Sequence, residues 1–178
     1  MNIPNSLTLL RIVLVPVIVI LLIDGNHVGA MIVFIVAGVT DGLDGFLARI
    51  LKQKTVLGAY LDPLADKALL VSSFITLSVL GIIPGWLAVI VISRDMVILL
   101  GILLLFMMSI SFDVKPAFIS KVTTLFQILT VLLVLMAKSC PLFVNGGVIE
   151  ISFWITAIVT VISGFQYLFR GIRFINGM

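Results

Sequence analysis

Charged residues are scarce in this sequence: they make up 11% of its 178 residues, whereas hydrophobic residues make up 62%. An ordinary soluble domain is about one quarter charged and about half apolar. The composition therefore excludes a water-soluble globule and a disordered chain. The 11 Lys and Arg residues are scattered, which argues against nucleic-acid binding. One cysteine and one histidine exclude an internal disulfide and make a zinc cluster a poor expectation.

Long apolar runs make up most of the sequence, and they predict an all-α integral membrane protein with six transmembrane helices. A span needs about 20 apolar residues, so the chain has no room for a soluble domain of normal size. We therefore expect one transmembrane domain over residues 1–178. Strands are not expected, because the runs are too long and lack alternation. The expected spans cover residues 7–23, 28–51, 62–81, 84–109, 116–137 and 148–174.

The positive charges predict the orientation in the membrane. With a cytoplasmic N-terminus, nine of the 11 Lys and Arg fall on one side, only Lys138 falls on the other, and Arg94 lies within a span. Because cytoplasmic loops are enriched in Lys and Arg, we expect a multi-pass protein of the inner membrane with both termini in the cytoplasm. The nine residues are Arg11, Arg49, Lys52, Lys54, Lys67, Lys115, Lys121, Arg170 and Arg173.

Four of the eight acidic residues crowd into 26 positions, as Asp41, Asp44, Asp62 and Asp66. Their i, i+3 and i, i+4 spacings place each pair on one face of its helix. The connection over residues 52–61 is short enough to make the two helices antiparallel neighbours. All four carboxylates are then expected in one cytoplasm-facing cavity, where their repulsion requires hard cations such as Mg²⁺ or Mn²⁺.

Structural roles are the alternative for these acids. Asp62 before Pro63 is a good helix cap, and Asp44 or Asp66 has Arg49 or Lys67 nearby for pairing. Four acids at membrane depth are costly to keep for capping alone, so we favour the metal site.

Small residues accompany the acids. Gly45 and Ala48 allow a ligand close to the helix, and Arg49, one turn later, suits bidentate phosphate binding. Thr55 and Gly58 are expected in a loop that faces the same opening.

These residues form a recognisable motif. The sequence reads Asp41-Gly-Leu-Asp44-Gly45-Phe-Leu-Ala48-Arg49, then eight residues, then Gly58-Ala-Tyr-Leu-Asp62-Pro-Leu-Ala-Asp66. It resembles the DxxDGxxAR…GxxxDxxxD pattern of the CDP-alcohol phosphatidyltransferase family, with every fixed position present.

Three further segments resemble the bacterial phosphatidylglycerophosphate synthases within that family. They are residues 2–11, residues 61–67, and Ser163-Gly164 followed by Tyr167. Residues 120–127 resemble a fourth segment, but Ser120 and Thr123 stand where that subfamily usually has Gly and Lys. The missing lysine at position 123 concerns the assignment of the acceptor, whereas the acidic motif is complete.

The resemblance implies transfer of a phosphatidyl group from CDP-diacylglycerol to sn-glycerol 3-phosphate, with release of CMP. It also implies a homodimer in membrane lipid and two Mg²⁺ or Mn²⁺ ions. Asp41, Asp44, Asp62 and Asp66 would bind the metals, and Asp66 would also act as the catalytic general base. The residues expected to bind the donor are Pro4, Asn5, Thr8, Gly45, Ala48, Arg49, Thr55 and Gly58; Thr8 has the alternative of a hydroxyl bonded to its own helix.

An anionic acceptor needs cations of its own. Arg94 is charged within a span, and Lys121 begins another, so both are expected to bind the acceptor phosphate. The alternatives are an ion pair of Arg94 with Asp95, although adjacent helix residues do not face each other, and snorkelling of Lys121 to lipid headgroups. Arg11 and Lys67 are further candidates.

Other functions fit parts of the pattern. A cardiolipin synthase of the same superfamily would use phosphatidylglycerol as acceptor, and phosphatidylinositol phosphate and phosphatidylserine synthases fit the N-terminal segment less well. An intramembrane prenyltransferase also uses Asp clusters with Mg²⁺, but it lacks the DGxxAR run. A divalent-cation transporter would need acids across the membrane, whereas the last two spans contain only Glu150.

Overall fold

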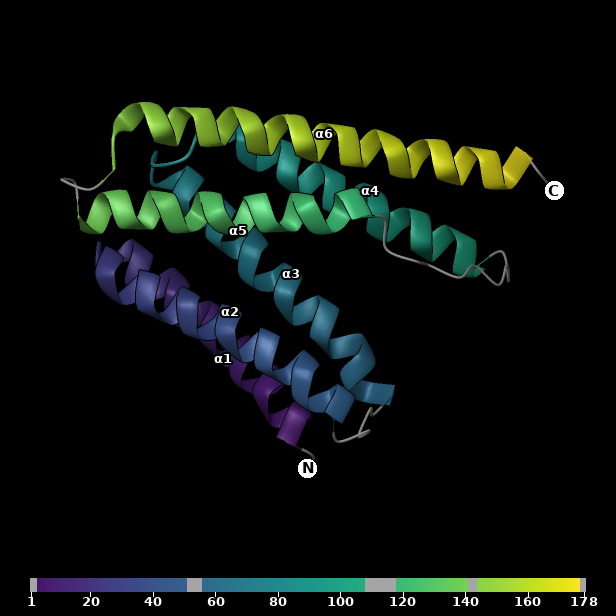
Figure 1. Ribbon diagram of the computed structural model, residues 1–178, viewed down its shortest axis with the longest axis horizontal. Coiled ribbons are helices and arrows are strands. Elements are labelled where there is room, and N and C mark those ends of the chain that lie inside the picture. Colours follow the sequence, from purple (N-terminus) through teal and green to yellow (C-terminus); the bar gives the residue numbers. More distant parts are fainter. Residues whose placement is uncertain (1–2, 51–55, 108–117, 141–143, 177–178) are drawn as a thin grey trace. The chain divides into compact units, whose positions relative to one another are not determined.

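The computed structural model describes the backbone of residues 3–50, 56–107, 118–140 and 144–176. Side chains are described over residues 9–40, 65–101, 119–140 and 144–169. The described backbone is helical with short turns and contains no strand, which confirms the all-α prediction (Figure 1). The helices are α1 (Ile3–Ile23), α2 (His27–Ile50), α3 (Val56–Val79), α4 (Gly85–Met107), α5 (Phe118–Ser139) and α6 (Gly146–Asn176).

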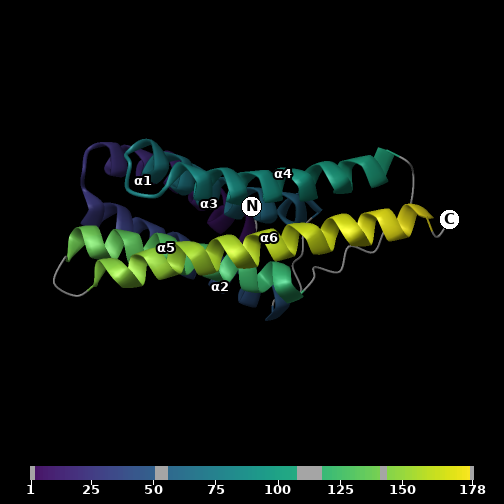
Figure 2. The same ribbon diagram turned by 90° about the horizontal axis from the view of Figure 1, so that it is seen from above.

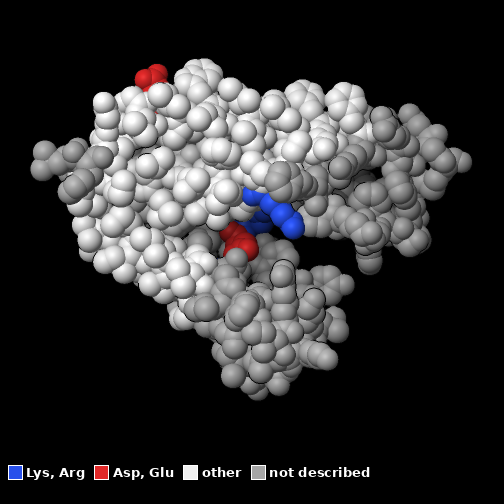
Figure 3. Space-filling view, in the orientation of Figure 1, with Lys and Arg blue, Asp and Glu red and all other residues white. Residues whose placement is uncertain are grey.

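Two helical segments are long and apolar enough to cross a membrane, as judged on the described residues alone. They are Ile119–Ser139 and Gly146–Phe169, and two shorter apolar segments are Leu9–Ile23 and His27–Thr40. The described side chains in view are mostly uncharged (Figure 3). Apolar residues such as Val13, Ile32 and Val89 are exposed, which suits helices that face lipid rather than water.

The chain forms two compact units. The first comprises Met1–Ile83 and Val131–Asn145, and the second comprises Pro84–Thr130 and Gly146–Met178. In the first unit α1 packs against both α2 and α3. In the second unit α6 packs against α4, and the part of α5 up to Thr130 bonds to α6 (Figure 2).

Buried side chains in the first unit follow the helical repeat. Ile18 and Leu22 in α1 are one turn apart, as are Leu70 and Phe74 in α3, and all four are buried. Residues at i and i+4 share a helix face, so each helix presents an apolar stripe to its neighbours. The first unit therefore has a packed core of aliphatic and aromatic side chains.

Glycines end α1 and α3. Gly25 and Gly81 have φ of 73° and 69°, a conformation that L side chains rarely adopt. In α1 the N–H of Asn26 bonds the carbonyl of Leu21, and the N–H of Gly25 bonds that of Leu22; α3 ends with the same pattern at Gly81. These are Schellman caps, and α1 and α3 end at Ile23 and Val79, close to the ends predicted at residues 23 and 81.

The start of α3 differs from the prediction. The helix begins at Val56 rather than near Asp62, so the predicted loop is wrong for residues 56–61, and its residues 52–55 lie outside the described residues. Gly58 lies in the helix and not in a loop, and Asp62 is not its N-cap. Pro63 therefore sits inside the helix, where it gives up one backbone hydrogen bond. The sequence favoured a later start because an Asp-Pro pair is typical of helix beginnings.

Phe74→Ala tests the packing of the first unit. Phe74 is completely buried in α3, so its truncation leaves a cavity and lowers the free energy of unfolding in detergent by about 3 kcal/mol. Phe165→Ala is the matched control, because Phe165 is 56% exposed and should cost less than about 1 kcal/mol. Thermal unfolding of both variants measures the difference; equal losses would contradict the packing.

Candidate functional site

The acidic motif lies where α2 ends and α3 begins. Asp44 lies six residues before the end of α2 at Ile50, and Asp62 lies six residues after the start of α3 at Val56. At 1.5 Å per residue, both lie about 9 Å along their helices from the connection. The side chains of Asp41, Asp44 and Asp62 lie outside the described residues, so their role as metal ligands stays a prediction.

Asp66 is the one member of the motif whose side chain is described. It lies in α3, beside the buried Ala65, and its side chain is 42% exposed. Arg11 Nη1 in α1 donates a hydrogen bond to Asp66 Oδ1 at 2.8 Å, which is the length of a charge-assisted bond. The contact joins residues 55 positions apart and ties α1 to α3.

The chemistry of Asp66 fits a hard divalent cation, because it offers a carboxylate with a large exposed fraction. Among the residues with described side chains, no group of three metal-ligating residues gathers; three of the four predicted ligands lie outside that set. Asp66 is therefore suited to hold such an ion together with the rest of the motif.

The predicted donor-binding residues lie on the same three helices. Pro4, Asn5 and Thr8 belong to the first two turns of α1. Gly45, Ala48, Arg49 and Gly58 flank the connection between α2 and α3. Thr55 lies outside the described residues, as do the side chains of the other seven, so nucleotide binding stays a prediction.

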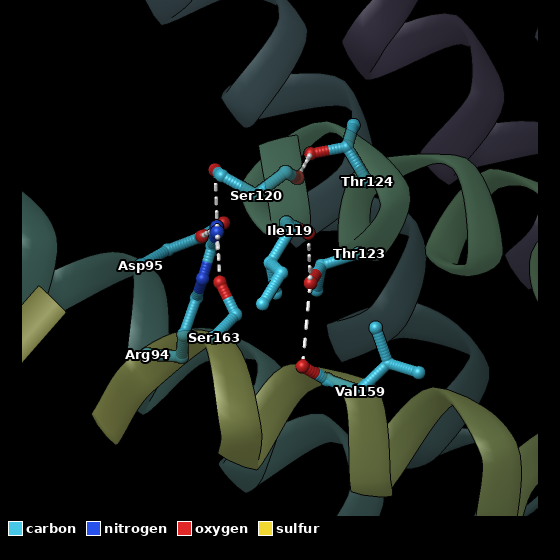
Figure 4. A network of polar contacts seen from close by, with 8 residues as sticks. All are labelled: Arg94, Asp95, Ile119, Ser120, Thr123, Thr124, Val159 and Ser163. Atoms are coloured by element: carbon cyan, nitrogen blue, oxygen red, sulfur yellow. Dashed lines mark hydrogen bonds and ion pairs between the residues drawn. The ribbon is translucent and has the colours of Figure 1, made fainter. Parts of the chain in front are cut away.

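A second polar cluster surrounds Arg94 in α4. Its Nη1 donates to Asp95 Oδ1 at 2.6 Å, and its Nη2 donates to Ser120 Oγ at 2.6 Å and to Ser163 Oγ at 2.8 Å. Figure 4 shows the guanidinium between side chains of α4, α5 and α6. The Tyr167 ring adds a cation–π contact at 5.9 Å. One arginine thus connects the three helices of the second unit.

The Arg94–Asp95 contact is the alternative that the sequence left open. Neighbouring positions point about 100° apart around a helix, which argued against the pair. The long arginine side chain nevertheless reaches the short aspartate, and both residues are buried. Arg94 is 5% exposed, and its Nε has no hydrogen-bond partner among the described residues. Binding of an acceptor phosphate stays a prediction beside this structural contact.

Lys121 follows Ser120 on α5 and is exposed. With Ser120 and Thr124 it lines an open hollow of about 350 Å³, whose other described lining residues are Leu125 and Ile128. Since Ser120 accepts a hydrogen bond from Arg94, the two predicted acceptor cations approach the same turn of α5. The structure therefore brings Arg94 and Lys121 to one region of the second unit.

Two of the hydroxyl partners of Arg94 carry no signal in the sequence that points to this contact. The pair with Asp95 was the stated alternative, but Ser120 and Ser163 were not predicted to bind Arg94, although the segment from Ser163 to Tyr167 was singled out by its resemblance. Thr123, which stands in place of a lysine, is buried and donates to the carbonyls of Ile119 at 2.8 Å and Val159 at 3.3 Å (Figure 4). A hydroxyl there joins α5 to α6 instead of adding a cation.

Comparisons with known proteins support the family that the acidic motif resembles. The sequence model of the CDP-alcohol phosphatidyltransferase family matches residues 1–162. A probable phosphatidylglycerophosphate synthase of Mycobacterium tuberculosis is 38% identical, over 99% of this chain and 85% of that protein. The CDP-diacylglycerol–glycerol-3-phosphate 3-phosphatidyltransferase of Bacillus subtilis is 31% identical, over 93% of each. Human cardiolipin synthase (CMP-forming) is 34% identical, over 96% of this chain and 62% of that protein.

The family match covers most of the chain and includes the whole acidic motif from Asp41 to Asp66. The chain belongs to the CDP-alcohol phosphatidyltransferase family.

Proposed function

We propose that the protein transfers the phosphatidyl group of CDP-diacylglycerol to sn-glycerol 3-phosphate, giving phosphatidylglycerophosphate and CMP. One observation carries this proposal: relatives named for this reaction or its product match 93–99% of the chain. The complete acidic motif supports it, because family members share the chemistry of that motif.

The proposed setting is the inner membrane. Residues 1–178 form one catalytic domain with six transmembrane spans, a cavity open to the cytoplasm and both termini in the cytoplasm. The long apolar helices and the exposed apolar side chains support spans in lipid. The one-sided distribution of Lys and Arg supports the orientation. A homodimer follows from the family resemblance.

Asp41, Asp44, Asp62 and Asp66 are the proposed ligands of two Mg²⁺ or Mn²⁺ ions. Such ions, when bound, neutralise the diphosphate of the donor and the leaving CMP. Pro4, Asn5, Thr8, Gly45, Ala48, Arg49, Thr55 and Gly58 are the proposed contacts of the donor. Small side chains at Gly45 and Ala48 leave room for a nucleotide close to the helix.

Asp66 is also the proposed general base. One of its carboxylate oxygens accepts the proton of the acceptor hydroxyl, and the hydroxyl oxygen attacks the phosphorus of the phosphatidyl group. The bond between this phosphorus and the bridging oxygen of the donor diphosphate breaks, and CMP leaves with that bridging oxygen. The exposed fraction of the Asp66 side chain supports this role, because an incoming alcohol needs access to it.

Arg94 and Lys121 are the proposed ligands of the acceptor phosphate. Their approach to one turn of α5 supports a shared role. Arg94 Nε, buried without a hydrogen-bond partner among the described residues, is a donor suited to a phosphate oxygen. Lys121 supplies a second, solvent-accessible charge.

Cardiolipin synthesis is the second candidate, favoured by the 34% identity to the human cardiolipin synthase. The two reactions differ only in the acceptor, a small phosphate ester in one and a whole phospholipid in the other. Synthases of phosphatidylinositol phosphate, prenyltransferases and cation transporters are more distant candidates.

An acceptor assay separates these functions. Purified protein receives CDP-diacylglycerol, Mg²⁺ or Mn²⁺, and one of glycerol 3-phosphate, phosphatidylglycerol, inositol phosphate or serine, and CMP release is measured. We expect release with glycerol 3-phosphate and its loss on chelation of the metal. Release with phosphatidylglycerol alone would replace the proposal with cardiolipin synthesis, and metal transport without CMP release would refute both.

Asp66→Asn tests the general base. The amide keeps an oxygen to accept from Arg11, so the hydrogen bond between α1 and α3 should persist, whereas CMP release by the folded protein should fall by at least about 10²-fold because the amide cannot take up the proton. Asp24→Asn is the matched control, since Asp24 is exposed in the turn between α1 and α2 and should leave turnover unchanged. Near-normal turnover of Asp66→Asn would remove the residue from catalysis.

Arg94→Ala tests the acceptor site. If the guanidinium binds the acceptor phosphate, the KM for glycerol 3-phosphate should rise at least about tenfold more than the KM for CDP-diacylglycerol. Ser163→Ala is the control, because it removes one partner of Arg94 and keeps the guanidinium. Equal changes of both KM values in Arg94→Ala would identify Arg94 as a purely structural connection.

A further inference from the structure

Arg11 is a completely buried cation in an apolar helix. Its exposed fraction is 0%, although the neighbouring Leu10 and Ile12 are exposed. It lies eight residues into α1, about 12 Å from the helix start. Burial of a guanidinium is costly unless an anion compensates it. The position of Arg11 therefore depends on the carboxylate that it contacts.

The two partners of this contact are buried to very different extents. The Arg11 side chain is enclosed, whereas 42% of the Asp66 side chain stays exposed. A ligand can therefore reach the exposed part of Asp66 but cannot reach the buried guanidinium. The hydrogen bond to Oδ1 gives Arg11 a direct way to act on a reaction at Asp66.

The backbone of Asp66 is fixed as well. Ala65 beside it is completely buried, and Leu69, one turn on from Ala65, is also buried. The packing of α1 against α3 holds the helix, and the 2.8 Å bond from Arg11 holds Oδ1. Because the helix backbone and Oδ1 are both restrained, the orientation of the Asp66 carboxylate is restricted.

We propose that Arg11 is a positioning residue for Asp66, a role that rests on the proposed function. From its enclosed site in α1, the guanidinium fixes Oδ1 of Asp66 and so orients the carboxylate before the acceptor arrives. It also offsets one of the four negative charges of the motif, which lowers their mutual repulsion. Misplacement of a reacting group by about 1 Å can cost about 10²-fold in rate.

Unfolding of the metal-free protein in detergent tests the contact itself. Asp66→Ala removes the carboxylate that accepts from the buried Arg11 and should lower Tm by on the order of 10 °C. Arg11→Met leaves a carboxylate that water can solvate, so this variant should lose less Tm than Asp66→Ala. The double variant should lose less than the sum of the two single losses. Additive losses would overturn the inference, because they would mean that the two side chains do not interact.

Kinetics test the positioning role. Arg11→Met should lower kcat by about 10²-fold and keep the KM for CDP-diacylglycerol within about threefold of wild type. Arg11→Lys, which keeps the charge but loses the planar geometry, should recover about tenfold of that loss. A folded Arg11→Met protein with wild-type kcat would overturn the proposal and leave Arg11 as a structural residue.

Leu22→Ala is the matched control for lost stability. Leu22 is buried in the same helix, about 16 Å along the axis from Arg11, so its truncation lowers Tm without reaching Asp66. Its kcat should equal that of wild type below its unfolding temperature; an equal loss of kcat in Leu22→Ala and Arg11→Met would refute positioning. Absence of CMP release from the wild-type protein would refute the proposed function. The unfolding measurements would still show whether Arg11 and Asp66 interact.

Discussion

A buried guanidinium needs a fixed acceptor, and this constraint organises both units of the protein. Arg11 in the first unit and Arg94 in the second are each nearly or completely enclosed, and each donates to a carboxylate at 2.8 Å or less. In apolar surroundings an unpaired charge is far more costly than in water. The helices that carry the acceptors, α3 in one unit and α5 and α6 in the other, are therefore held in register with the arginine.

The two arginines have different consequences because their partners differ. Asp66 remains partly exposed, so the contact with Arg11 leaves a carboxylate available for chemistry. Asp95 is enclosed together with Arg94, and the serine hydroxyls of α5 and α6 complete the arrangement (Figure 4). The first contact is suited to orient a reactive group, whereas the second joins three helices beside the hollow next to Lys121.

On the proposed function, donor chemistry and acceptor choice belong to different parts of the chain. The acidic motif lies on α2 and α3, and relatives named for phosphatidylglycerophosphate and for cardiolipin synthesis both match this region. Ser120 and Thr123 depart from the phosphatidylglycerophosphate synthase pattern and lie at the Arg94 cluster and the α5–α6 contact. Their hydroxyls replace a small residue and a cation, which changes both the space and the charge available to an acceptor.

The sequence by itself determined the helical class, the ends of α1 and α3 close to Gly25 and Gly81, and the spacing of the acidic motif, because each depends on neighbours within a few residues. It did not determine that α3 starts at Val56, since the Asp-Pro pair is a local start signal that the longer helix overrides. Only the tertiary structure decided that Arg11 meets Asp66 and that Arg94 meets Ser163, 69 positions away. Helical periodicity gives the face on which a side chain lies, but the partner of that face depends on how each helix is rotated and packed.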